Sequence, residues 1–250
     1  MLHYARLVRT VQILFITLKQ HSVTTSNCAK QDFPSTELLL NEQTKYECIK
    51  KMKYIKVPER ELTEENQKRA AVLIPLCLVK NNLSLLYTLR KADLKRHRGQ
   101  VSFPGGMEDA TDTSLEYTAL RETEEELGIS RKDIHLWGSG CIYVGKEFSV
   151  LPVVGYLGDI DIQKLNPNPD EVEVAFTLPL KHFCEPENCK STQFRYRGQS
   201  YILPTYINGE YRVWGITALI THIFLVSLLP NIYKHKLNFI KSVVPKKKSD

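Results

Sequence analysis

The chain has 250 residues, of which 42% are hydrophobic and 25% are charged. This composition excludes a chain without a core and predicts a soluble globular protein with one good-sized domain plus extensions. The net charge of +6 suits a polyanionic ligand such as a nucleotide, and it is too modest to favour nucleic acid as the main partner.

Residues 1–35 differ in composition from the rest of the chain. They contain basic residues, Ser and Thr, a short apolar run at residues 13–18, and no acidic residue before Asp32. This pattern fits a mitochondrial presequence, and the alternatives are an irregular segment or a wrongly assigned start. We therefore expect a mitochondrial protein, with the peroxisome and the cytosol as alternatives. The basic tail, residues 233–250, does not end in a Ser-Lys-Leu type of peroxisomal signal.

The six cysteines are scattered along the chain, mostly in apolar segments. Cys184 and Cys189 have four residues between them and no second close pair, so their spacing does not indicate a zinc site. We expect all six to be reduced thiols in an intracellular compartment. They are Cys28, Cys48, Cys77, Cys141, Cys184 and Cys189.

The first half of the chain predicts a helical lead-in followed by a β-hairpin. Residues 36–68 are polar and charged, and we expect a helix there. Residues 70–79 form an apolar run typical of a buried strand, Asn81 and Asn82 predict a turn, and residues 83–89 return as the partner strand. A basic loop follows at residues 91–98.

Residues 101–128 predict a strand end, a glycine turn and a helix. Gly105 and Gly106 allow the backbone to approach a ligand closely. Thr113 and Glu116 have the spacing of a capping box, so a helix of about four turns is expected to begin near Thr113. Gly128 stands where a helix C-terminal glycine belongs. Leu115, Ala119 and Leu120 form much of the apolar side of this helix.

The other side of this helix is acidic. Glu122, Glu125 and Glu126 are spaced i, i+3 and i+4, so they share one face. Carboxylates this close repel each other unless a multivalent cation neutralises them, and carboxylate oxygens are the ligands that Mg²⁺ prefers. The alternative is a solvated acidic face, but the preceding glycine turn favours a metal site.

The second half of the chain predicts further strands and one apolar helix. A turn-rich loop covers residues 166–171, and residues 184–200 are expected to be a polar excursion. The apolar run at 216–229 is too short to span a bilayer, so it predicts a buried amphipathic helix that covers the sheet. Strands are expected at 133–137, 141–144, 150–157 and 172–178, a helix start near Pro179, and a strand pair formed by 201–206 and 211–214.

The segment from Gly106 to Ile129 resembles a Nudix box, whose second half reads Arg-Glu-apolar-x-Glu-Glu-x-Gly-apolar. Arg121 to Ile129 match that half closely, although Thr123 stands at an apolar position. Asp112 replaces the first Glu of the box, and the spacing is one residue longer. The longer spacing resembles the coenzyme A branch of the family.

A second stretch supports that branch. Its signature is a Thr-x-Arg-Ser strand end, basic residues, and then Gly-x-Val-x-Phe-Pro-Gly-Gly. In this chain Thr88 and Arg90 match the strand end, Lys91 replaces the Ser, and Gly99 to Gly106 match the rest. Residues 213–218 also resemble the opening of that subfamily's last helix. The resemblance covers about residues 70–230.

The resemblance implies a Nudix α/β/α sandwich, with a mixed sheet flanked by helices. The implied domain is residues 69–232, with 36–68 leading into it. The implied reaction is hydrolysis of the diphosphate of coenzyme A (CoA) or acyl-CoA, with Mg²⁺ or Mn²⁺ as cofactor. Alternatives are another nucleoside diphosphate derivative such as ADP-ribose, NADH or capped RNA, or a catalytically weak nucleotide-binding domain.

The resemblance also assigns roles to individual residues. Glu122, Glu125 and Glu126 would be catalytic metal ligands, and Arg121 would hold a box carboxylate in place. Arg is suited to bidentate phosphate contacts, so the basic residues before the glycine turn are candidates for substrate binding. The substrate-binding candidates are Arg90, Lys95, Arg96, His97, Arg98, Gly105 and Gly106, and a further acidic ligand could come from Glu147 or Glu171.

Overall fold

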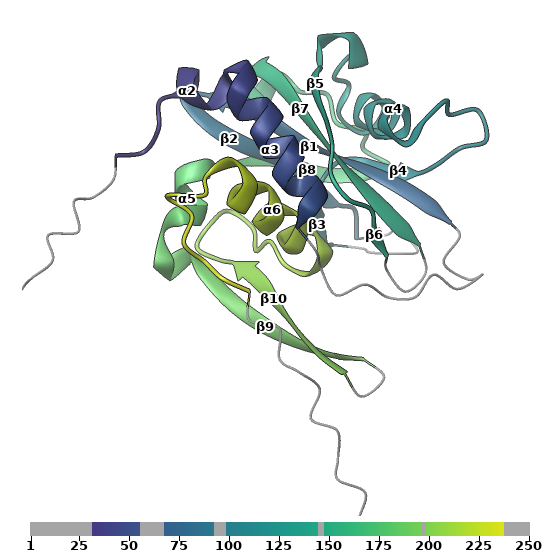
Figure 1. Ribbon diagram of the computed structural model, residues 1–250. Coiled ribbons are helices and arrows are strands. Elements are labelled where there is room, and N and C mark those ends of the chain that lie inside the picture. Colours follow the sequence, from purple (N-terminus) through teal and green to yellow (C-terminus); the bar gives the residue numbers. More distant parts are fainter. Residues whose placement is uncertain (1–31, 56–67, 93–98, 145–147, 197–198, 238–250) are drawn as a thin grey trace, which may run out of the picture. The chain divides into compact units, whose positions relative to one another are not determined.

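The computed structural model of this chain describes residues 32–55, 68–92, 99–144, 148–196 and 199–237 (Figure 1). The helices are α2 (Thr36–Leu40), α3 (Glu42–Tyr54), α4 (Leu115–Leu127), α5 (Leu180–Cys184) and α6 (Gly215–Leu228). The longer strands are β1 (Arg69–Val79), β2 (Asn82–Arg90), β5 (His135–Ser139), β7 (Ser149–Asp159), β8 (Val172–Pro179), β9 (Cys189–Tyr196) and β10 (Gln199–Tyr206). Three short strands complete the set: β3 (Val101–Ser102), β4 (Gly105–Met107) and β6 (Tyr143–Val144).

A mixed sheet forms the centre of the fold. Its main path runs β3–β2–β1–β7–β5, with β4 paired to β1, β6 to β7 and β8 to β2. The β1–β7 pairing is parallel, and the long connection between these strands includes α4; the remaining pairings are antiparallel. The sheet carries α4 on one face, and α3 and α6 belong to the core of the other (Figure 1). The predicted sandwich of a mixed sheet flanked by helices is confirmed.

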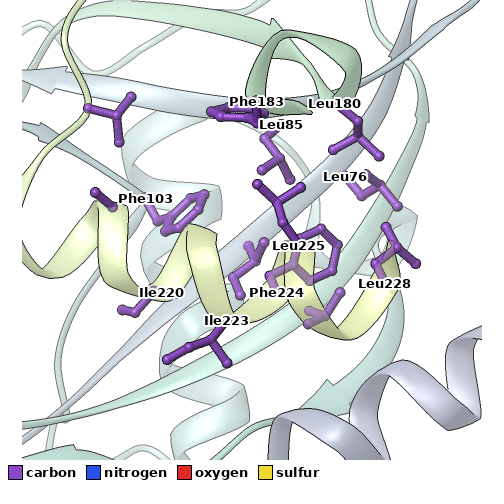
Figure 2. Close-up of a cluster of buried hydrophobic side chains, with 14 of the residues drawn as sticks. Leu76, Leu85, Phe103, Leu180, Phe183, Ile220, Ile223, Phe224, Leu225 and Leu228 are labelled. Carbon is purple, nitrogen blue, oxygen red and sulfur yellow. The ribbon is translucent and has the colours of Figure 1, made fainter. Parts of the chain in front are cut away.

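The alternation of side chains along β2 explains the two cores. Leu85 and Tyr87 belong to the larger core with α6, whereas Leu86 belongs to the smaller core with α4. Figure 2 shows the larger core, where apolar side chains of α6 meet side chains from the strands and α5. Full burial of a Leu or Phe side chain stabilises the fold by about 1.5–3 kcal/mol. Labelled members of this core are Leu76, Leu85, Phe103, Leu180, Phe183, Ile220, Ile223, Phe224, Leu225 and Leu228.

Helix α6 is buried on nearly all sides, so the predicted amphipathic character is wrong. Thr217, Thr221 and His222 are buried together with its apolar residues. The reason is that α6 contacts β10 and α3 in addition to the core. No helix within the described ranges combines the length and apolarity needed to cross a membrane.

The predicted polar excursion at residues 184–200 is also wrong. After a short 3-10 turn, β9 pairs antiparallel with β10 over eight residue pairs, from Cys189 opposite Tyr206 to Tyr196 opposite Gln199. Residues 211–214 were expected to pair with 201–206, but only Tyr206 and Val213 form a bridge. The polar composition of residues 189–196 hid the strand, which pairs across the hairpin; the Thr192 and Thr205 hydroxyls, for example, lie 2.7 Å apart.

The remaining elements lie within a few residues of their predicted positions. The turn after β1 uses Lys80 and Asn81, which have φ of 48° and 62°, and Asn82 already belongs to β2. The lead-in is two helices, α2 and α3, instead of one, and residues 56–67 lie outside the described ranges. The five described cysteines are free thiols.

Candidate active site

Helix α4 begins one residue later than expected. The hydroxyl oxygen of Ser114 accepts a hydrogen bond from the Tyr117 backbone N–H at 3.1 Å, so Ser114 and not Thr113 is the N-cap. Glu116 does not complete a capping box, because its carboxylate accepts a hydrogen bond from the Ser139 hydroxyl on β5. At the other end, Gly128 has φ of 68° and its N–H donates to the Glu124 carbonyl, as predicted for a C-terminal glycine.

The apolar side of α4 packs on the sheet. Leu115, Ala119 and Leu127 are buried in the smaller core with β1 and β7 residues, and Leu120 packs against it, as predicted. Thr123 is fully buried at the position where the Nudix pattern has an apolar residue. Its hydroxyl donates to the Ala119 carbonyl at 2.7 Å, which satisfies the polar group within the helix.

The three glutamates share one face of α4 but differ strongly in exposure. The Glu125 side chain is 53% exposed, Glu122 is 16% exposed and Glu126 is 1% exposed. Of the three glutamates, only Glu125 is exposed in the way that a solvated acidic face would require. Burying a carboxylate is costly unless it is paired or binds a cation. The contacts of Glu122 and Glu126 therefore indicate what the site can bind.

Arg121 ties the acidic face to the loop before α4. Its guanidinium forms two hydrogen bonds with the buried Asp112 carboxylate, at 2.8 and 3.0 Å. The same group contacts Glu122 and Glu125, each at 2.9 Å, and donates to the Met107 carbonyl at 3.2 Å. Arg121 holds the pKa of Asp112 well below its usual range. Asp112, which the sequence left without a role, is thus the anchor of Arg121.

The glycine turn lies directly under Glu122. A Cβ atom added at Gly106 would overlap the Glu122 carboxylate, and one added at Gly105 would overlap the Ala71 carbonyl. Gly105 also has φ of 149°, where side chains are rarely tolerated. Burial raises the pKa of Glu122, and Arg121 opposes this shift. Gly106 therefore makes room for the Glu122 carboxylate, and Gly105 makes room for the β1 backbone.

Glu126 is the most deeply buried carboxylate of the site. Its Oε1 atom pairs with Nη1 of Arg90 at 3.0 Å, and its Oε2 atom is buried and has no hydrogen-bond partner among the described residues. Burial raises the pKa of Glu126 to about 8, and the nearby charges of Glu171 and Glu122 add to the shift, whereas Arg90 and a hydrogen bond from the Gly105 backbone oppose it. An unpaired buried oxygen is expensive, and it marks a place where a ligand or ion would compensate.

The predicted substrate residues fall into two groups. Arg90, Gly105 and Gly106 lie beside the glutamates, on β2 and β4. Glu171 lies in the loop before β8, and its backbone carbonyl accepts a hydrogen bond from the Lys91 N–H at 3.0 Å. The residues that lie outside the described ranges are Lys95, Arg96, His97, Arg98 and Glu147.

The acidic face fits a cation that keeps most of its water. Within the described residues, no group of three or more His, Cys, Asp or Glu side chains is arranged to hold a metal ion by itself. The carboxylates of the acidic face are instead paired with arginines: Arg121 contacts Glu122 and Glu125, and Arg90 contacts Glu126. Mg²⁺ binds through one or two carboxylates together with substrate phosphates and waters, so the free Oε2 of Glu126 and the Glu122 carboxylate are suitable donors.

Comparisons with known proteins agree with this site. The family described as NUDIX domain matches residues 67–196. The chain is 44% identical to the mitochondrial coenzyme A diphosphatase NUDT8 of Mus musculus, over 67% of this chain and 81% of that protein. It is 45% identical to NUDT8 of Homo sapiens, over 67% of this chain and 72% of that protein. The peroxisomal coenzyme A diphosphatase NUDT7 of Mus musculus is 32% identical over 68% of this chain and 74% of that protein. Together with the acidic helix and its glycine turn, these matches lead to one conclusion: the chain belongs to the Nudix family of hydrolases.

Proposed function

We propose that this protein hydrolyses the diphosphate bridge of CoA and acyl-CoA, giving 3′,5′-ADP and 4′-phosphopantetheine or its acylated form. The observation that carries the catalytic part is the buried Glu126 carboxylate with a free oxygen, next to Glu122 on one helix face. The substrate part rests on the names of the NUDT8 relatives and on the Thr88 to Gly106 stretch.

Glu122, Glu125 and Glu126 would hold the Mg²⁺ or Mn²⁺ ions. When bound, such ions neutralise the charge of the diphosphate, which otherwise repels an anionic nucleophile. Glu122 is our candidate for orienting and deprotonating the attacking water, as the resemblance to the Nudix box implies, and its carboxylate lies on the acidic face directly over the glycine turn. The water oxygen bonds to phosphorus, the bridging P–O bond breaks, and the proton passes to Glu122.

Two further roles are proposed for residues around the acidic face. Glu171 is a candidate for an additional acidic ligand, because its charge raises the pKa of both Glu122 and Glu126. The basic residues Lys95 to Arg98 would contact the 3′-phosphate and diphosphate of CoA through charge-assisted hydrogen bonds. Gly105 and Gly106 would shape the turn under the site, where the β1 backbone and the Glu122 carboxylate lie against them.

A substrate panel tests the proposal. Catalytic efficiencies of the full chain would be measured with Mg²⁺ or Mn²⁺ on CoA, dephospho-CoA, ADP-ribose, NADH and capped RNA. We expect CoA to be cleaved fastest, and dephospho-CoA more slowly because it lacks the 3′-phosphate. A preference for ADP-ribose, NADH or capped RNA would support a different Nudix hydrolase, and no turnover with any substrate would support a nucleotide-binding domain.

We also propose that the protein acts in mitochondria, in keeping with the names of the NUDT8 relatives and the basic, Ser- and Thr-containing residues 1–35. The catalytic domain would be residues 69–232. A fluorescent fusion to residues 1–35 should co-localise with a mitochondrial marker. Diffuse signal from this fusion, together with full-length protein in peroxisomes, would contradict the proposal.

A further inference from the structure

Arg90 has a second set of contacts besides its ion pair with Glu126. Its backbone N–H donates to the Gln100 carbonyl at 3.0 Å, and its carbonyl accepts from the Gly99 N–H at 2.9 Å. These two bonds fix the Arg90 backbone at the end of β2, beside the glycine turn. Its side chain is only 24% exposed and points to a carboxylate that is 1% exposed. Both the backbone and the guanidinium group of Arg90 are therefore held in place.

The two carboxylate oxygens of Glu126 have different surroundings. Arg90 pairs with Oε1, the Gly105 backbone N–H also interacts with the carboxylate, and the buried Oε2 has no partner within hydrogen-bond geometry among the described residues. A carboxylate held by Arg90 and by the Gly105 backbone has a restricted orientation, and this restricts the position of Oε2. Hydrogen-bonded partners of this kind orient metal ligands, and their loss weakens metal binding about 10–100-fold.

We propose that Arg90 is a positioning residue, which presents the free oxygen of Glu126 to the divalent cation and does not bind the substrate's phosphates. This inference rests on the proposed role of Glu126 as a metal ligand. It changes the role expected for Arg90. A phosphate-binding arginine would contribute to substrate affinity, whereas Arg90 contributes to metal affinity before any substrate binds.

The direct test measures Mn²⁺ binding to the full chain without substrate, by electron paramagnetic resonance of free Mn²⁺. Arg90→Gln should weaken Mn²⁺ binding about 10–100-fold, and Arg90→Lys should weaken it less, because the lysine keeps the charge but not the planar fork. At saturating Mn²⁺ the KM for CoA should stay within about threefold of wild type for both variants. Circular dichroism melts of both variants establish that they are folded.

Arg131→Gln is the matched control. Arg131, in the 3-10 turn that follows α4, pairs with Glu124 of α4 at 2.8 Å, and this pair lies outside the acidic face. Its loss should leave Mn²⁺ affinity and KM unchanged. If Arg131→Gln weakens Mn²⁺ binding as much as Arg90→Gln does, the effect belongs to the helix in general and the inference is wrong.

Glu126→Gln separates this inference from the proposed function. If Glu126→Gln weakens Mn²⁺ binding while Arg90→Gln leaves it unchanged and raises the KM for CoA, Arg90 binds substrate and the inference is overturned, with the proposed function intact. If Glu126→Gln itself leaves Mn²⁺ binding unchanged, the assignment of Glu126 as a ligand fails, and the role of Arg90 fails with it.

Discussion

The carboxylate of Glu122 occupies the space where a side chain at Gly106 would begin. The two residues come from different elements, the acidic helix α4 and the short strand β4, so their contact sets the distance between the helix face and the glycine turn. The two glycines of the turn differ in what an added side chain would meet. A Cβ atom at Gly106 would meet the flexible Glu122 side chain, whereas one at Gly105 would meet the β1 backbone.

Gly106→Ala should therefore damage activity more than stability. The added methyl group displaces the Glu122 carboxylate, which can move without disturbing the sheet, and we expect turnover of CoA to fall about 100-fold. Gly105→Ala is the comparison, because its methyl group meets backbone at φ of 149° and should destabilise the fold by at least about 1–3 kcal/mol. Steady-state kinetics and thermal melts of both variants check this. Equal activity loss with equal stability loss in the two variants would contradict it.

Removing single charges from the acidic face should abolish catalysis with little effect on folding. Glu125→Gln and Glu126→Gln should each lower turnover at least about 100-fold at saturating Mg²⁺, because each weakens charge neutralisation at the diphosphate. The Glu126 variant should stay folded, since the amide is nearly isosteric with the carboxylate and keeps the packing of the site. Glu124→Gln, which removes the partner of Arg131 on the same helix, should retain near-wild-type turnover. Wild-type rates for both Glu125→Gln and Glu126→Gln would overturn the assignment of the face.

Much of this site was predictable from the sequence because it is local. The spacing of Glu122, Glu125 and Glu126 fixes a shared helix face, and Gly128 fixes the helix end, whatever the rest of the fold does. The sequence could not show that Glu126 is buried against Arg90, because that pair joins residues 36 positions apart. The β9–β10 hairpin was missed for a related reason, since its polar residues become a strand only through pairing.

Acid should destabilise the fold through His222. This side chain is 7% exposed, and its Nδ1 atom lies 2.8 Å from the Tyr233 hydroxyl, which in turn lies 2.6 Å from the Tyr206 hydroxyl. Burial, together with the charge of His235, lowers the pKa of His222 from 6.5 to about 4. The unfolded chain therefore binds a proton at His222 more tightly than the folded chain does. The contribution of neutral, buried His222 to the free energy of unfolding is complete above pH 6.5 and is lost as the pH falls towards 4.

The expected loss from His222 between pH 7.5 and pH 4.5 is on the order of 2–3 kcal/mol in the free energy of unfolding. Other acidic and basic groups also titrate in this range, so the comparison uses variants. Urea unfolding at both pH values should show that His222→Gln loses about that much less stability than wild type. His135→Gln, which changes an exposed histidine on β5, should behave like wild type. The same pH dependence in wild type and His222→Gln would show that burial of His222 does not set it.

The proposed function requires the acidic face of α4 to support metal-dependent cleavage of the CoA diphosphate. Product identification by mass spectrometry tests this, after incubation of the full chain with CoA and either Mn²⁺ or a chelator. We expect equal amounts of 3′,5′-ADP and 4′-phosphopantetheine with Mn²⁺, none with the chelator, and a rate at least about 100-fold lower for Glu122→Gln. Intact CoA in the presence of Mn²⁺, release of inorganic phosphate alone, or full activity of Glu122→Gln would contradict it.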